Sequence, residues 1–184
     1  MTKIPTHHFI YGTLIDYITG EELTDTDDER FRQDLSKMMV EELGYAKEEL
    51  EPRCFIESLF STQFVRSNIE LAVSLKEHGK KFLIIRYGPG SLVSRERSAI
   101  AAARVLEKEY RIPLAVVTNG RDAELLDTAT GKVLATGMEA IPSRSQAEEM
   151  FAELKFLDPP EGKKREGELR ILNAFDLEIC CRSF

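Results

Sequence analysis

The segment YGPGSLVSRERS, residues 87–98, contains residue types that bind anions. Gly88 and Gly90 have no side chains to keep a ligand from the backbone amides, and a helix is expected to begin shortly after them. Arg95 and Arg97 carry positive charge at that helix start. The pattern therefore predicts an anion-binding turn at these four residues. The competing interpretation is a turn that only joins a strand to a helix.

Other patterns typical of catalytic or metal sites do not occur in the sequence. It contains neither the nucleophile pattern G-x-S-x-G nor the phosphate-loop pattern G-x-x-x-x-G-K-[ST]. His7 and His8 are adjacent, so in an extended segment they point to opposite sides, and we expect them at the surface. Cys54, Cys180 and Cys181 form no C-x-x-C pair and are expected to be buried or idle thiols, without a disulfide framework or zinc site.

Composition indicates a single soluble domain covering residues 1–184, because 42% of the residues are apolar and 31% are charged. The N-terminal residues include no hydrophobic stretch suited to a signal peptide or membrane span, so we expect a cytoplasmic protein that does not bind membranes. The formal net charge is -7, and an acidic chain binds nucleic acid only if its cations gather on one face. The densest basic cluster, EGKKREGELR at 161–170, is interleaved with acids and is predicted to be a solvated loop.

Periodicity predicts the elements of the first half of the chain. A strand or hairpin turning at Thr19-Gly20 is followed by a helix over 25–45, with Asp27 or Asp28 as its cap and Gly44 at its end. Strands are predicted over 53–60, 69–75 and 81–87. The loop KEHGK is short, so the last two strands should form an antiparallel hairpin.

The second half continues with a predicted helix over 94–110, a strand over 112–120 covered on both faces, and a hairpin over 123–136. A further helix is predicted over 143–157 with Ser143 or Ser145 as its cap, and residues 167–184 fit either a helix or a strand. Helices alternating with strands predict an α/β fold with a central mixed β-sheet flanked by helices.

Several of these segments, in this order, resemble the N-terminal nuclease domain of type I restriction enzyme R subunits, which belongs to the PD-(D/E)XK nuclease superfamily. The similarity is carried by ERFRQDLSKMMVEELGYAKEELEP, FVRSNIELAVSL, FLIIRYGPG and IPLAVVTNG. It implies a restriction-endonuclease-like core over about residues 10–142, with 143–184 as a helical or extended C-terminal extension.

The resemblance also implies where a metal site would stand. The family holds Mg²⁺ with an Asp on one strand and a Glu on the next, and a Lys two residues after the Glu assists the attacking water. The Asp place resembles Asn68, and the acid-x-lysine place resembles Ile85 and Tyr87, with Arg86 on the opposite strand face. The side chain of Ile has no oxygen that could coordinate a cation. The resemblance therefore implies a degenerate active site without catalytic residues, metal or cofactor.

Three interpretations follow. The first is a non-catalytic binding or scaffold module whose partner is a protein, a nucleic acid or a small ligand. The second is an active Mg²⁺-dependent DNA endonuclease in which Glu29 or Glu70 serves as a relocated ligand; Glu70 shares the strand face of Asn68. The third is a shared architecture with an unrelated function. Because residues 85–87 contain no acid, the sequence favours the first. The apolar segment ILNAFDLEICC could pair two copies of the chain if the core does not use it.

Overall fold

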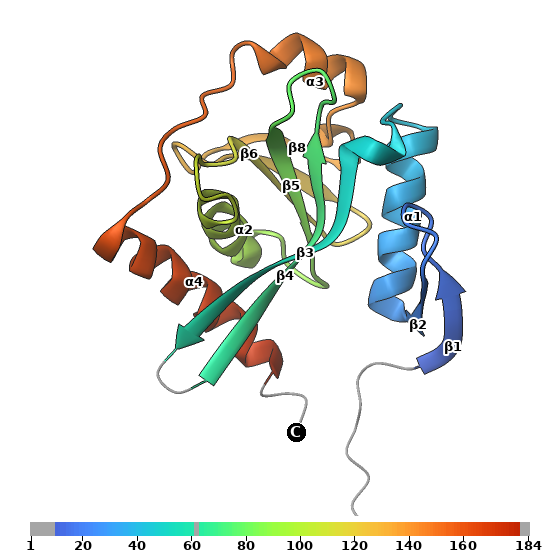
Figure 1. The fold of residues 1–184 in the computed structure, drawn as a ribbon, viewed down its shortest axis with the longest axis horizontal. Coiled ribbons are helices and arrows are strands. Elements are labelled where there is room, and N and C mark those ends of the chain that lie inside the picture. Colours follow the sequence, from blue (N-terminus) through green and yellow to red (C-terminus); the bar gives the residue numbers. More distant parts are fainter. Residues whose placement is uncertain (1–9, 61–62, 181–184) are drawn as a thin grey trace, which may run out of the picture.

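A six-stranded mixed β-sheet forms the centre of the protein, with the strands in the order β3-β4-β5-β6-β7-β8 (Figure 1). The computed structural model describes residues 10–60 and 63–180. The strands are β3 (Leu50–Phe60), β4 (Gln63–Ser74), β5 (Lys81–Tyr87), β6 (Leu114–Thr118), β7 (Ala123–Asp127) and β8 (Val133–Thr136). Among the described strands, only β5 and β6 pair in parallel; helix α2 (Val93–Val105) crosses between them, as a parallel connection requires. The predicted α/β fold with a central mixed sheet is confirmed.

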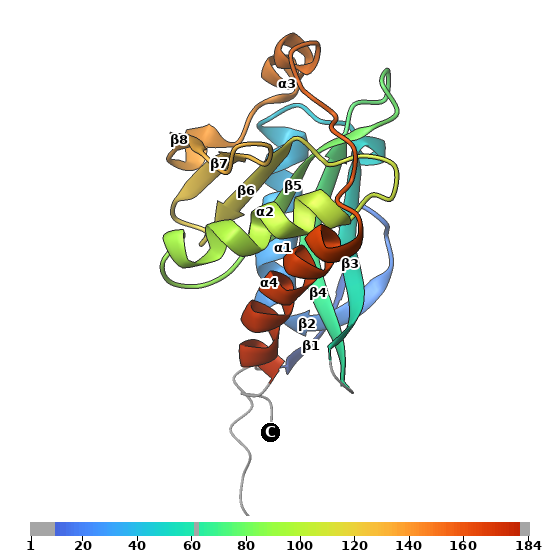
Figure 2. The same cartoon turned by 90° about the vertical axis from the view of Figure 1, so that its left-hand side faces the viewer.

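Helices cover both faces of this sheet (Figures 1 and 2). Helix α1 (Asp27–Glu41) lies on one face, and α2 and α4 (Gly162–Cys180) lie on the other. The hairpin of β1 (Ile10–Ile15) and β2 (Glu22–Thr26) forms a separate two-stranded sheet beside α1. The predicted N-terminal hairpin is therefore confirmed, as are the antiparallel β4–β5 and β7–β8 pairs.

Two apolar cores follow from the alternation of side chains along the strands. Leu83 and Ile85 of β5 pack on the α1 side with Met39, whereas Ile84 packs on the α2 side with the alanines of that helix. All five residues of β6 are buried, as predicted for a strand covered on both faces.

Helix termini differ in detail from the sequence-based predictions. Thr26, and not Asp27 or Asp28, caps α1: its hydroxyl accepts a hydrogen bond from the Glu29 amide at 3.2 Å. Ser143 caps α3 (Arg144–Phe151), and this helix ends well before the predicted residue 157. Two short 3₁₀ helices, Lys47–Glu49 and Met138–Ala140, complete the described elements.

The prediction of a solvated loop over 161–170 is wrong, because residues 162–170 form the first half of α4. Burial along this helix supplies the physical reason: Leu172 is fully buried in the core beneath α2, and Asn173 and Asp176 are also buried. Leu172, Asn173 and Asp176 of the C-terminal segment are thus used within the fold, and pairing of two copies through the rest of the segment stays a prediction.

Candidate functional site

The strand segment Ile85–Tyr87 marks the place where the resemblance puts an acid and a lysine. Ile85 is fully buried in the core beneath α1, and the ring of Tyr87 stacks on Phe31 of α1 with 3.8 Å between the ring centroids. Arg86 points to the other face, where it contacts Ser98 and forms an ion pair with Asp176 at 3.0 Å. The predicted alternation is confirmed, and apolar and aromatic packing fills the side facing α1.

The turn after β6 supports this aromatic stack. Gly120 has φ +83°, and a Cβ atom on it would lie 3.1 Å from the Phe31 ring, so the glycine leaves room for the ring. The Asn119 side chain accepts hydrogen bonds from the amides of Arg121 and Asp122 and donates one to the Gly90 carbonyl at 3.1 Å. Asn119 of the Thr-Asn-Gly sequence therefore links the loop after β6 to the loop after β5 by a hydrogen bond.

Asn68 lies apart from Ile85 and Tyr87, the other two motif positions. Leu71 is the β4 residue opposite Ile85, so Asn68 stands three residues farther along the strand, about 10 Å away. Asn68 is exposed, whereas residues 69–73 are all buried. The strand enters the core between Asn68 and Glu70, which is why the two residues have different surroundings despite their spacing of two.

Glu70 is an acid in direct contact with the motif segment. Its side chain is buried. Its Oε2 accepts a hydrogen bond from the Tyr87 amide at 2.7 Å. Burial raises the pKa of Glu70, and the nearby Arg86, the Tyr87 amide and Arg32 oppose this only in part. Burial therefore opposes the charged form of this carboxyl, which is the form that binds a divalent cation.

Glu29, the second candidate acid, begins α1 and is also buried. One carboxylate oxygen pairs with Arg32, and the other accepts a hydrogen bond from Gln33 Nε2 at 2.9 Å. Arg53 Nη1 lies 3.9 Å from the same oxygen. Both oxygens of the Glu29 carboxylate thus already have partners within the chain. A metal ion would need at least one of these oxygens to be free.

Asp16 and Arg53 complete this polar cluster. Arg53 pairs with the Asp16 carboxylate, which also accepts hydrogen bonds from Gln33 and from the amides of Ile18 and Thr19. Burial alone would raise the pKa of Asp16, but the hydrogen bonds from Thr19, Gln33 and Arg53 lower it to about 2. Sequence reasoning missed both residues, because neither stands in a motif.

Arg53 has φ 57°, in the left-handed region that non-glycine residues rarely adopt. Such strain persists only where surrounding contacts compensate for it, and the ion pairs with Asp16 and Glu21 provide that compensation. No sequence signal indicates a left-handed arginine, since the conformation depends on partners 37 and 32 residues away.

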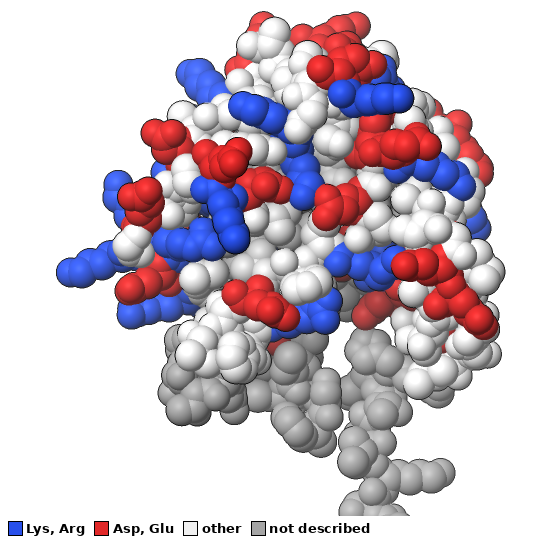
Figure 3. All heavy atoms as spheres, in the orientation of Figure 1, with Lys and Arg blue, Asp and Glu red and all other residues white. Residues whose placement is uncertain are grey.

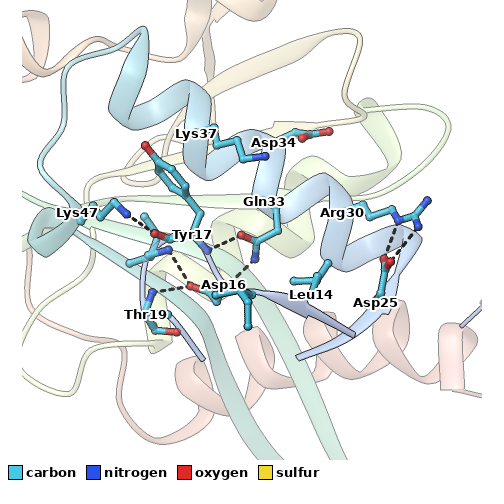
Figure 4. Close-up of a pocket in the computed structure, with 13 residues that line it drawn as sticks. Leu14, Asp16, Tyr17, Thr19, Asp25, Arg30, Gln33, Asp34, Lys37 and Lys47 are labelled. Atoms are coloured by element: carbon cyan, nitrogen blue, oxygen red, sulfur yellow. Dashed lines mark hydrogen bonds and ion pairs between the residues drawn. The ribbon is translucent and has the colours of Figure 1, made fainter. Parts of the chain in front are cut away.

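An open cavity of about 790 Å³ lies beside this cluster, between α1 and the turn after β1 (Figure 4). Asp16 and Gln33 form part of its wall. Figure 4 shows that these side chains point toward one another, while Asp34 and Lys37 extend from α1 at the rim. Arg30 is held by Asp25 at 2.6 Å, and Lys47 donates to the Tyr17 carbonyl. The polar groups of this cavity therefore mostly satisfy one another.

The arrangement does not fit the Mg²⁺ ion that the family resemblance implies. The side chain of Ile85 has no oxygen, Glu29 is paired with arginine, and Glu70 is buried with one oxygen bonded to the Tyr87 amide. Within residues 10–60 and 63–180, no three His, Cys, Asp or Glu side chains are grouped so that they could hold a metal ion. A hard dication needs several anionic or carbonyl oxygens on one side, and these residues do not supply them.

The four residues of the predicted anion-binding turn are not all brought together. The Arg95 guanidinium lies against Gly88, and its Nη2 donates to the Pro89 carbonyl at 3.1 Å. Arg95 therefore stabilises the loop that precedes its own helix. The Gly90 carbonyl accepts the bond from Asn119. Arg97 instead lines a separate cavity on the α2 side of the sheet.

The remaining predicted residues play no part in this cluster. Cys54 is buried, as predicted, and burial raises the pKa of its thiol to about 12, which keeps it protonated and unreactive. His7, His8, Cys181 and the side chain of Cys180 lie outside the part that the structure describes. Among the described helices, none has the length and apolar character that crossing a bilayer requires.

Comparison with known proteins gives one finding. Residues 27–142 match the family model described as type I restriction enzyme R protein N terminus, and this match covers more than half of the chain. No curated protein and no solved structure matches the chain. The matched residues include α1, the strands β3 to β8 and α2, and thus the whole polar cluster except Asp16 and Glu21.

Proposed function

Because the chain belongs to the family of type I restriction enzyme R protein N termini, we propose that it is a non-catalytic member that acts as a binding or scaffold module. The observation that carries this proposal is the packing at β5. Ile85 is fully buried where the family pattern requires a metal-binding acid, and Tyr87 stacks on Phe31 where it requires a lysine. An aliphatic and an aromatic side chain replace the metal ligand and the charge that would orient a water.

Glu29 supports the same proposal. Arg32 and Arg53 supply positive charge beside Glu29, so the chain's own cations neutralise the carboxylate that a metal would otherwise neutralise. Freeing this carboxylate would require breaking a buried ion pair, at a cost of about 3 kcal/mol. This cost opposes its recruitment as a metal ligand.

A protein partner is favoured by the exposed face of the β3–β4 hairpin. Phe55, Leu59 and Phe64 lie on this face with 44%, 62% and 85% of their surface exposed. Arg66 stacks over Phe55 at 3.7 Å from the ring centroid. Exposed aromatic and aliphatic side chains on one strand face are typical of surfaces that another protein covers.

The test is cleavage of supercoiled and linear DNA by the unaltered protein at high concentration with Mg²⁺ or Mn²⁺, next to a sample containing EDTA. We expect no cutting above the EDTA background. Isothermal titration with Mn²⁺ in the same buffer should show no saturable binding, which separates a missing metal site from a missing substrate.

The competing function, a nuclease with relocated ligands, gives a different result. EDTA-sensitive cutting that copurifies with the protein and is lost in Glu70→Gln or Glu29→Gln would overturn the non-catalytic proposal. Glu166→Gln is the matched control, because this exposed residue of α4 is remote from the cluster and loses the same charge.

A further inference from the structure

A second cavity, of about 650 Å³, lies on the opposite side of the sheet from the polar cluster. It is bounded by α2, the beginning of α4 and the turn between β7 and β8. Five cationic side chains line it: Arg97, Arg104, Arg111, Lys163 and Lys164. Glu168 is its one acidic lining residue. The tertiary structure thus gathers positive charge in one concave place on a chain whose net charge is -7.

Two of these cations are fixed by the surrounding backbone. Arg104 Nε donates to the Thr128 carbonyl at 2.8 Å, and its Nη1 pairs with Glu168 at 2.8 Å. Arg111 Nε donates to the Asp158 carbonyl at 2.6 Å. These contacts hold the two guanidinium groups in defined positions. The ion pair with Arg104 also neutralises the negative charge of Glu168.

The other three cations are exposed and have no such partners. Within the described residues, the side chains of Arg97, Lys163 and Lys164 make no hydrogen bond or ion pair. Figure 3 shows Lys and Arg side chains, with acids between them, at the left-hand edge where Figure 1 places the beginning of α4. Positive charge is therefore available to a ligand at the rim of the cavity.

The position of the two lysines breaks a local rule of helix stability. Lys163 and Lys164 stand in the first turn of α4, which contains no acid. The helix dipole makes a cation unfavourable at this end and an anion favourable. Local rules are broken most often where function requires it, and a bound anion would compensate both lysines.

We propose that this cavity binds the phosphate groups of a small phosphorylated ligand. Its volume is in the range of small-molecule sites. The apolar residues Ile100 and Ile171 line it beside the cations and provide a surface for the organic part of the ligand. Gly131 and Gly167 leave parts of the wall without side chains. The site is independent of the proposed function, because it shares no residue with the α1 side of the sheet.

The test is isothermal titration of the full chain with inorganic tripolyphosphate and with ADP, at about 0.15 M salt, where remote charges are screened. We expect saturable binding of one equivalent of either probe. Lys163→Glu/Lys164→Glu should raise the dissociation constant about tenfold or more, because two charge-assisted contacts are replaced by repulsion. The acids favour the helix start, so the variant should remain folded, as its Tm will show.

Lys37→Glu/Lys155→Glu is the matched control: it changes the net charge equally at two exposed residues outside this cavity and should leave affinity within about twofold. Arg97→Glu should weaken binding in the same direction as the lysine variant. The proposal is overturned if neither probe binds at millimolar concentration, or if both double variants weaken binding equally. It is also overturned if only a single-stranded oligonucleotide of about ten nucleotides binds, because the site would then take a polymer.

Discussion

Asp16 and Arg53 form a buried ion pair in which an arginine of the chain, and not a bound metal ion, balances the charge of the carboxylate. The side chain of Asp16 is almost wholly buried and is surrounded by donors from Arg53, Gln33 and two backbone amides. A carboxylate with this many donors is stabilised in its charged form, which is the usual situation of a metal ligand. Here the cation is a guanidinium of the same chain, and no exchangeable ion is required.

This pair predicts a pH-dependent contribution to stability. The pKa of Asp16 is about 2 in the folded protein and 3.8 ordinarily, so its contribution is present above pH 3.8 and is lost as the pH falls through about 2. At neutral pH, Asp16→Asn should lower the free energy of unfolding by about 2 kcal/mol. Urea unfolding at several pH values measures this, and the difference between the two proteins should shrink below about pH 4. A difference that does not change with pH would contradict the pKa assignment.

At the scale of elements, α4 is the part whose role depended on packing. Its apolar residues fit a helix or a strand in sequence, but Leu172 is inserted beneath α2 and Asp176 pairs with Arg86 of β5. Ser58 of β3 also donates to Asn173 at 2.7 Å. Helix α4 thus contacts both the sheet and helix α2, and we infer that it unfolds together with them.

Leu172→Ala should therefore destabilise the whole fold. Removing a fully buried leucine leaves a cavity and costs about 3 kcal/mol. Circular dichroism in urea should show one transition with a lower midpoint and an unchanged slope. Leu134→Ala, at a position on β8 that is 53% exposed, should change the midpoint little. A normal midpoint for Leu172→Ala would mean that α4 is not docked on α2 in solution.

At the scale of the whole molecule, the polar cluster and the basic cavity lie on opposite sides of one sheet. The first joins α1, β3 and the turn after β1; the second joins α2, α4 and the turn after β7. The metal site that the resemblance implies would need acids of β4 and β5 close together. On the α1 side of β5 the structure instead has Ile85 in the core and the Tyr87–Phe31 stack.

Rebuilding the motif tests this placement. The triple variant Asn68→Asp/Ile85→Glu/Tyr87→Lys should have a lower Tm than the unaltered protein, because a buried acid replaces Ile85. Because Asn68 stands about 10 Å from Ile85, Mn²⁺ should leave the Tm of the variant and that of the unaltered protein unchanged. A rise in the Tm of the variant with Mn²⁺, absent from the control Asn68→Asp/Ile85→Gln/Tyr87→Lys, would show that the three positions can converge on one cation.

Much of the fold was predictable because its signals are local. The buried run at Leu114–Thr118 indicates a covered strand, and the spacing of Phe31, Leu35 and Met39 indicates a helix with one apolar face. Cap choice was less predictable: Thr26, Asp27 and Asp28 all have suitable oxygens, and backbone geometry selects Thr26. That Ile85 and Tyr87 stand where the resemblance puts an acid and a lysine is likewise readable from residue identity.

Tertiary structure alone decided which charged residues meet. Arg53 joins Asp16, 37 residues away, and Arg104 joins Glu168 across two helices, so neither pair has a sequence signal. The same holds for Glu70, whose spacing from Asn68 suggests a shared face although the core covers only Glu70. Periodicity reports the direction of a side chain relative to its own element. Burial and charge pairing depend on what the other elements place there, and that is why residue identity indicated Ile85 and Tyr87 at the motif positions but not the arginines that pair with Asp16 and Glu29.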